Sequence, residues 1–107
     1  MFVFIATMLF GCYREDIRTF EIHVPQMNNE NCAQRVRAAF FVGGGQFKEG
    51  ILDLELNVAE RTVTVTYNST LTARKNLEYL LTHAGFDAND EKARPEAQAN
   101  LPAECRP

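Results

Sequence analysis

The spacing of the hydrophobic residues constrains the fold of this chain more than any other feature. Between positions 18 and 88 the hydrophobic residues recur first at every second position and then at helical spacing. They recur again at every second position in two successive segments and finally at helical spacing. Alternation is typical of a strand with one buried face, and a period of about 3.6 residues is typical of a helix with one buried face. The sequence therefore predicts the order strand, helix, strand, strand, helix.

The first strand and the first helix are predicted on either side of a polar loop, residues 26–31. The strand extends from Arg18 to Pro25 and ends there, because proline has no N–H to donate to a neighbouring strand. The helix begins at Cys32, and the glycines at 43–45 are expected to end it, because glycine adopts the left-handed conformation that closes many helices. The predicted buried faces consist of Phe20, Ile22 and Val24 in the strand and of Ala33, Val36, Ala39 and Phe40 in the helix.

Two further strands, residues 51–58 and 62–67, are separated by a short turn, and strands this close in sequence usually form a hairpin. A second helix is expected to open near Thr70, which supplies a capping side chain, and to end at Gly85. Residues 86–88 could begin a short fourth strand. The inward-facing residues are predicted to be Leu52, Leu54, Leu56 and Val58, then Val63, Val65 and Tyr67, and in the helix Leu77, Leu80, Leu81 and Ala84.

These elements predict an α+β domain, a ferredoxin-like βαββαβ sandwich in which two helices cover one face of an antiparallel sheet. A polar C-terminal tail, residues 89–107, follows the domain. Pro95 suits the first position of a short helix in this tail. Leu101 is the residue expected to anchor the tail to the domain.

The charge and the motifs exclude several functions. The chain of 107 residues has 14 acidic and 11 basic residues and a net charge of −3. Nucleic-acid binding depends on clustered basic side chains, and the sequence contains neither such a cluster nor a polybasic membrane-binding patch. The sequence also lacks a Ser-His-Asp arrangement and a phosphate-binding loop after a strand, so we do not expect an enzyme.

The first twelve residues carry no charged side chain. This apolar run is too short to cross a bilayer, which needs about 20 residues, but it has the length of the hydrophobic part of a signal peptide. Its end, Leu9–Cys12, resembles a bacterial lipobox, in which the cysteine is lipidated. We therefore expect a lipoprotein signal peptide at residues 1–11 that is cleaved before Cys12, a tether at residues 12–17, and a lipid-anchored protein in the cell envelope, periplasmic or on the outer surface. The alternative is a hydrophobic strand that ends in a buried Cys12.

Residues 18–88 resemble the heavy-metal-associated domain, the small βαββαβ module of copper and mercury chaperones and of P-type metal ATPases. The resemblance is carried by the loop Met27–Cys32, the glycines at 43–45, the strand Val63–Asn68 and the segment Ala84–Ala88. In this family a Met-x-Cys-x-x-Cys loop between the first strand and the first helix binds the metal. Cys32 matches the second cysteine of that loop, whereas Asn29 stands in place of the first.

The resemblance implies that the domain binds or transfers a soft metal ion. Cu(I) is the first expectation, and Hg(II) and Zn(II) are alternatives, because thiolates suit these ions. A metal transporter or another metal-binding domain is the implied transfer partner. Cys32 is the expected ligand, and three residues are expected to support the loop: Met27 and Phe86 by packing, and Asn29 as an oxygen donor or as a helix cap.

One thiolate alone binds a metal ion weakly, so Cys32 needs a second donor. Cys105 lies in the tail, which spans up to about 60 Å when extended and is therefore long enough to return to the loop. Cys32 and Cys105 then form either a two-thiol metal site or a disulfide that pins the tail of a structural or interaction domain, and a dithiol pair is able to cycle between the two states. Sharing of one metal ion between the Cys32 residues of two molecules is a third alternative. His23 and His83 are expected to be surface residues.

Overall fold

A computed structural model of the chain describes residues 15–43 and 45–107. The expected signal peptide and lipidated Cys12 therefore lie outside the described residues. Within the described part of the chain, none of the helices has the length and apolar character needed to cross a membrane.

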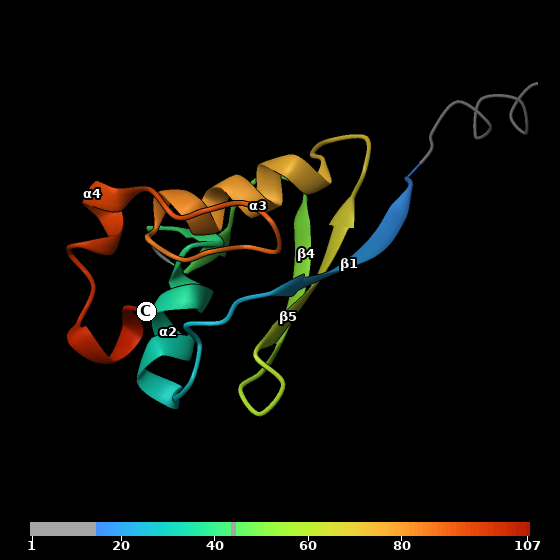
Figure 1. The fold of residues 1–107 in the computed structure, drawn as a ribbon. Coiled ribbons are helices and arrows are strands. Elements are labelled where there is room, and N and C mark those ends of the chain that lie inside the picture. Colours follow the sequence, from blue (N-terminus) through green and yellow to red (C-terminus); the bar gives the residue numbers. More distant parts are fainter. Residues whose placement is uncertain (1–14, 44) are drawn as a thin grey trace, which may run out of the picture.

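The described residues form a three-stranded antiparallel sheet in the order β1-β5-β4 (Figure 1). Its strands are β1 (Ile17–His23), β4 (Ile51–Asn57) and β5 (Thr62–Asn68). The central strand, β5, pairs with both neighbours, so that Val65 lies opposite Phe20 of β1 and Leu54 of β4. The hairpin predicted between the second and third strands is thus confirmed.

Alternation along β5 separates its two faces as the sequence predicts. Val63, Val65 and Tyr67 are buried, whereas the threonines between them are partly exposed. β4 is less regular, because its pairing with β5 shifts between Ile51 and Asp53. This irregularity makes Ile51 the buried residue and leaves Leu52 49% exposed, so the prediction that Leu52 faces inward is wrong.

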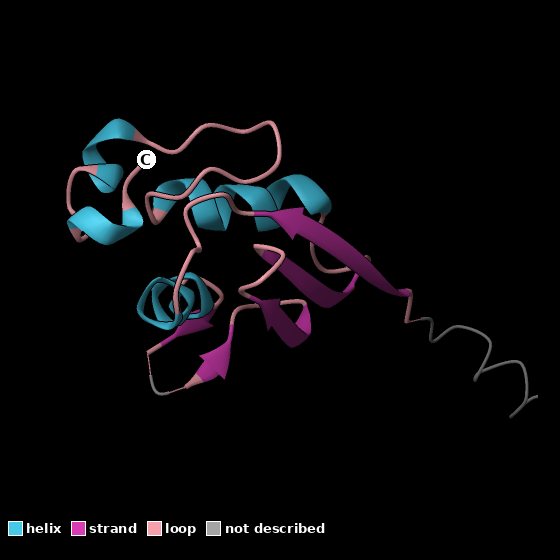
Figure 2. Ribbon diagram, turned by 60° about the horizontal axis from the view of Figure 1, so that its bottom comes forward, coloured by secondary structure: helices cyan, strands magenta, loops and turns pink. Residues whose placement is uncertain are grey.

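Two main helices, α2 (Glu30–Ala38) and α3 (Arg74–His83), cover the apolar face of the sheet (Figure 2). Their buried apolar residues belong to one hydrophobic core together with residues from all three strands. This arrangement confirms the predicted α+β fold. The largest fully buried side chains of the core are Phe40, Phe86, Ile22, Met27, Leu77 and Leu81.

The glycines at 43–45 do not end the first helix, as the sequence suggested. α2 stops at Ala38, and the short strands β2 (Phe41–Val42) and β3 (Gln46–Phe47) follow it as an antiparallel pair. Gly43 and Gly45 belong to the turn of this pair, and Gly45 has a φ of 83°. The rings of Phe41 and Phe47 lie with their centroids 4.5 Å apart across the pair, which favours this hairpin over a longer helix.

The second helix begins later than predicted. Its N-cap is Ala73, which makes no side-chain capping bond, and the first helical residue is Arg74. The hydroxyl of Thr70 instead donates to Asn68 Oδ1 at 2.7 Å, and the Thr70 amide donates to the same oxygen at 3.0 Å. Asn68 therefore organises a local turn that competes with helix formation at this point.

A regular fourth strand is not formed within the described residues. Ala88 makes only an isolated bridge with Glu91, and the backbone between them turns through Asn89, whose φ is 53°. Asn89 still meets the edge of β1: its amide donates to the His23 carbonyl at 2.9 Å, and its Oδ1 accepts from the His23 amide at 2.9 Å. The chain touches β1 at one residue and then turns away into the tail.

The tail packs against the domain. It contains a short helix, α4 (Pro95–Gln98), with proline in its first turn as predicted, and a 3-10 turn, η1 (Ala103–Cys105). Leu101 is only 6% exposed, which agrees with its predicted role as the anchor. Figure 1 shows the C-terminus beside α2, so the tail crosses the molecule to the side where the first helix lies.

Candidate thiol site at the start of α2

The loop between β1 and α2 is held by the turn that joins β4 to β5. The Val24 amide donates to the Arg61 carbonyl at 2.8 Å, and the Arg61 guanidinium donates to the Pro25 carbonyl at 3.0 Å. Met27 closes a tight turn by donating its amide to the Val24 carbonyl at 3.0 Å, and its side chain is fully buried. Met27 is therefore a core residue of the loop, as expected.

Asn29 is the N-cap of α2. Its backbone is extended, with φ −157° and ψ 172°, and its Oδ1 accepts from the Cys32 amide at 2.9 Å. Its amide nitrogen donates to Asn28 Oδ1 at 2.9 Å. Both polar atoms of the Asn29 side chain are thus used inside the loop, which favours the capping alternative over the oxygen-donor alternative.

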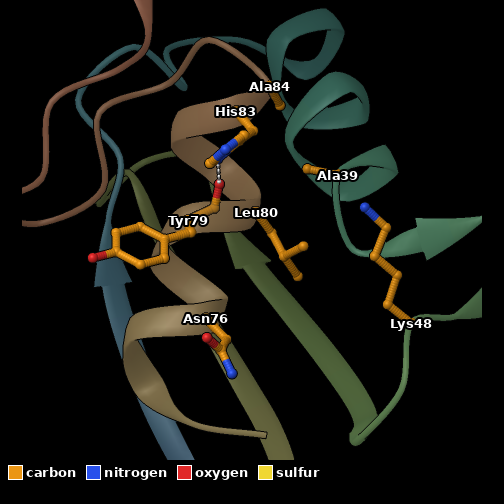
Figure 3. Close-up of a pocket in the computed structure, with 7 residues that line it drawn as sticks. All are labelled: Ala39, Lys48, Asn76, Tyr79, Leu80, His83 and Ala84. Atoms are coloured by element: carbon orange, nitrogen blue, oxygen red, sulfur yellow. Dashed lines mark hydrogen bonds between the residues drawn. The ribbon is translucent and has the colours of Figure 1, made fainter.

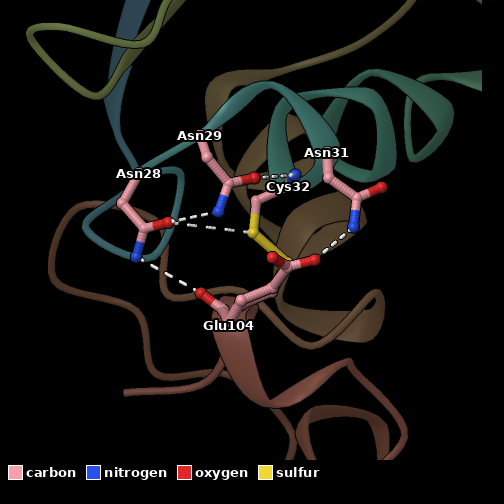
Figure 4. The surroundings of a disulfide bond; sticks show 6 residues. Asn28, Asn29, Asn31, Cys32 and Glu104 are labelled. Atoms are coloured by element: carbon pink, nitrogen blue, oxygen red, sulfur yellow. Dashed lines mark hydrogen bonds between the residues drawn. A yellow bond between two sulfur atoms is a disulfide. The ribbon is translucent and has the colours of Figure 1, made fainter.

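The structure brings Cys32 and Cys105 together as a disulfide (Figure 4). The two residues are separated by 73 positions in sequence, and their Cα atoms lie 5.6 Å apart. Both side chains are 0% exposed. Cys32 lies in the first turn of α2, three residues after the N-cap Asn29.

Polar side chains from both segments surround this disulfide (Figure 4). Asn31 Nδ2 donates to a carboxylate oxygen of Glu104, and Asn28 Nδ2 donates to the Glu104 carbonyl at 3.3 Å. Asn28 Oδ1 lies 4.0 Å from Cys32 Sγ. Asn31 and Glu104 were not among the predicted site residues, because each is a polar residue in a polar segment and no local pattern connects the two.

Phe86 supports the same region from the other side. It is fully buried and belongs to the hydrophobic core that contains Met27 and both cysteines. The next residue, Asp87, donates its amide to Gln26 Oε1 at 3.1 Å, and Gln26 is itself buried. The segment after α3 therefore contacts the loop before α2 through both apolar packing and a buried hydrogen bond.

The histidines take no part in this site. His23 is exposed and lines a hollow beside Phe20 and Arg74. His83 is also exposed, and its Nδ1 lies 2.7 Å from the Tyr79 carbonyl, to which it donates. Within residues 15–43 and 45–107, no group of three or more His, Cys, Asp and Glu side chains is arranged to hold a metal ion.

The hollow beside His83 has a volume of about 500 Å³ and lies between α3 and the C-terminal end of α2 (Figure 3). In Figure 3 the side chain of Leu80 points toward Ala39 and Lys48, whereas the ring of Tyr79 points away from them. The polar groups that line this hollow do not converge on one point, so the thiol pair remains the stronger candidate for a functional site.

No family model matches this sequence, and no curated protein matches it significantly. Solved structures do match its fold. Oxidized MerP from Ralstonia metallidurans CH34 aligns with a TM-score of 0.59 and 22% identity over 69% of this chain and 96% of its own. The putative copper-ion-binding protein from Bacillus anthracis str. Ames aligns with a TM-score of 0.60 and 18% identity over 71% of this chain and 100% of its own.

A third structure, the apo form of the HMA domain of the copper chaperone for superoxide dismutase, aligns with a TM-score of 0.56 and 21% identity over 77% of this chain and 76% of its own. These identities are low, so the likeness is one of fold. The chain is therefore structurally similar to heavy-metal-associated domains and has their ferredoxin-like α+β fold.

Proposed function

We propose that this protein binds a soft metal ion through the reduced thiols of Cys32 and Cys105, and that the disulfide is its closed form. One observation carries the proposal: two cysteines 73 positions apart meet at the start of α2, in the loop position of the metal ligands of the family that the chain resembles. Two thiolates are suited to Cu(I), and Hg(II) and Zn(II) are the alternatives.

Metal binding requires that the disulfide is first reduced. Each reduced sulfur would then bond the ion separately, so the two sulfurs would have to move apart from their positions in the disulfide. Cys105 is the partner that is easier to displace, because it lies in a 3-10 turn of three residues, whereas Cys32 is fixed in the nine-residue helix α2. The Cys105 side is thus expected to open.

Transfer of the ion would proceed by ligand exchange with the thiols of a partner. Because both sulfurs are fully buried in the disulfide form, a partner reaches them only after the end of the tail has moved. The expected partner is a metal transporter or another metal-binding domain. The exchange needs no catalytic group, so the protein acts as a carrier and not as an enzyme.

A second candidate function is a structural or interaction domain in which the Cys32–Cys105 disulfide is permanent. The complete burial of both sulfurs favours it, since a cross-link inside a core is protected from reductants. The structural candidate is also favoured by Asn29, which stands where the resembled family has its first cysteine and whose side chain caps α2. This candidate keeps the fold and excludes metal binding.

Titration of Cu(I) into the reduced protein, against a competing chelator, separates the two candidates. The metal proposal predicts one tightly bound ion per reduced molecule and loss of this binding in Cys32→Ser and Cys105→Ser. His23→Ala serves as the control, because His23 is an exposed potential donor outside the thiol pair. If the reduced wild type binds no more Cu(I) than Cys105→Ser, the metal proposal is wrong and the structural candidate stands.

Asn29→Cys adds a sharper comparison. It places a second cysteine at the N-cap of α2, three residues before Cys32. If the wild-type pair is already a complete site, the variant gains little affinity for Cu(I). If the wild type does not bind Cu(I) measurably and Asn29→Cys binds it tightly, the absence of a second loop cysteine is what limits the affinity of the domain for Cu(I).

We also propose that the protein is anchored in the cell envelope through a lipid on Cys12. The uncharged run that ends at Cys12 supports this proposal. Fractionation of cells that express the full chain would place the wild type with membranes and Cys12→Ser in the aqueous fraction. Equal distribution of the two would contradict the anchor.

A further inference from the structure

The end of the tail is attached to the start of α2 by contacts other than the disulfide. Asn31 Nδ2 donates to the carboxylate of Glu104, and Asn28 Nδ2 donates to the Glu104 carbonyl at 3.3 Å (Figure 4). The residue that follows, Cys105, closes the η1 turn by donating its amide to the Pro102 carbonyl at 2.9 Å. Glu104 thus receives hydrogen bonds on both its side chain and its backbone.

The asparagines that make these bonds are themselves fixed. Asn29 donates to Asn28 Oδ1 and accepts from the Cys32 amide, both at 2.9 Å. Asn31 lies in the first turn of α2. A continuous set of hydrogen bonds therefore runs from the backbone of Cys32 to the residue next to Cys105. The carboxylate of Glu104 also lies beside the N-terminal turn of a helix, where the peptide dipoles favour a negative charge.

We propose that Glu104 is a positioning residue that holds Cys105 over Cys32 when the disulfide is reduced. Its bonds to Asn28 and Asn31 do not depend on the sulfur–sulfur bond, so they persist in the dithiol. The two thiols then stay adjacent, which favours renewed oxidation. The idea that Glu104 preorganises a metal site rests on the proposed function. The effect of Glu104 on the distance between the two thiols does not depend on any metal.

Exchange with glutathione measures this effect directly. The protein disulfide and two glutathione thiols yield the protein dithiol and one glutathione disulfide; the protein sulfur–sulfur bond takes up two electrons and two protons, which the two glutathiones lose. The equilibrium constant gives the effective concentration of Cys105 at Cys32. A contact that holds the tail in place raises this concentration, whereas a tail that is released on reduction lowers it.

The experiment compares the full chain with Glu104→Ala, Glu104→Gln and Glu96→Ala. Glu104→Ala removes the acceptor for Asn31 and should lower the effective concentration by roughly threefold to tenfold, as expected for one hydrogen bond. Glu104→Gln keeps a carbonyl oxygen that accepts from Asn31 and should retain most of the wild-type value. Glu96→Ala is the matched control, because Glu96 is an exposed acidic residue of α4 whose ion pair is with Arg94, at 3.5 Å.

Asn31→Asp provides a second test from the other partner. It replaces the donor by a carboxylate that faces the carboxylate of Glu104, so the effective concentration should fall by about tenfold or more at neutral pH. Equal values for the wild type, Glu104→Ala and Asn31→Asp, with unchanged circular dichroism, would overturn the proposal.

The outcome remains separable from that of the metal proposal. If Glu104→Ala lowers the effective concentration while the reduced wild type fails to bind Cu(I), the positioning role stands and the metal function falls. If Cu(I) binds tightly and Glu104→Ala leaves the glutathione equilibrium unchanged, the metal function stands and the positioning role falls.

Discussion

At the scale of single residues, Asn29 determines how α2 begins. Its side chain accepts the Cys32 amide at 2.9 Å and so satisfies one of the N–H groups that a helix leaves unpaired at its start. A thiol at this position would cap the helix poorly. Asn29 is therefore a structural residue of this loop, and the sulfur that meets Cys32 comes from a distant part of the chain.

The capping role of Asn29 is measurable without any metal. Asn29→Ala should lower the free energy of unfolding by about 1 kcal/mol, because it removes the cap while the disulfide stays intact. Asn29→Asp keeps a capping oxygen and should remain near the wild type. Urea unfolding of the oxidised proteins provides the comparison, and an Asn29→Ala variant as stable as the wild type would contradict the assignment.

At the scale of elements, β1 and β5 are joined at one end by Asp16 and Ser69. The Ser69 amide donates to the Asp16 carbonyl at 2.8 Å, and the Ser69 hydroxyl donates to the Asp16 carboxylate at 2.6 Å. Arg18 adds a bond from its Nε at 3.1 Å. The hydrogen bond from Ser69, and then that from Arg18, hold the pKa of Asp16 below its ordinary value of 3.8.

Removal of the hydroxyl should therefore raise the pKa of Asp16. NMR titration of Ser69→Ala is expected to move it toward its ordinary value, and Arg18→Ala should move it less. Because the folded-state pKa is the lower one, this carboxylate stabilises the fold above its ordinary pKa, and the contribution is lost as the pH falls through the lowered pKa. An Asp16 pKa that is identical in Ser69→Ala and the wild type would contradict this account.

The junction of α3 and α4 depends on Gly85. Its φ is 102°, and a Cβ atom there would lie 2.9 Å from the Ala97 carbonyl oxygen. Gly85→Ala should cost about 2 kcal/mol or more of unfolding free energy, because it combines backbone strain with a contact that only backbone movement relieves. Gly43→Ala is the control, since nothing lies within 4 Å of a Cβ at that position. Thermal unfolding should separate the two variants clearly, and equal midpoints would contradict the packing described.

At the scale of the whole molecule, the Cys32–Cys105 bond closes every element after β1 into one loop, because the two cysteines have a sequence separation of 73. Such a cross-link restricts the unfolded state and should contribute about 4 kcal/mol to stability. Urea unfolding of the oxidised wild type and of Cys105→Ser should differ by this amount, and addition of a reductant should remove most of the difference. A difference below about 1 kcal/mol would show that the tail adds little constraint.

Local patterns explain which parts of the fold could be predicted. The alternation in β5 and the helical spacing in α2 and α3 depend on neighbouring residues, so the sequence indicates them directly. The irregular pairing at Ile51 depends on the partner strand, and so does the contact of Asn89 with β1. The pairing of Cys32 with Cys105 was predicted in two of three alternatives, as a metal site or as a disulfide, but the prediction rested on the length of the tail and not on a local pattern. The bond between Asn31 and Glu104 leaves no periodic signal at all.

The turn at Asn89 also determines how the sheet ends. The Val24 amide pairs across the sheet with Arg61, whereas the backbone of His23 faces outward to Asn89. Alternate residues of a strand direct their backbone N–H and C=O groups to opposite sides. The backbone groups of Ile17, Thr19 and Glu21 therefore face away from β5. Within the part of the chain that the structure describes, they lie along the open edge of β1. Open edges invite aggregation through strand addition, and charged side chains oppose it. Resistance to aggregation at this edge therefore depends on the charges of β1 itself.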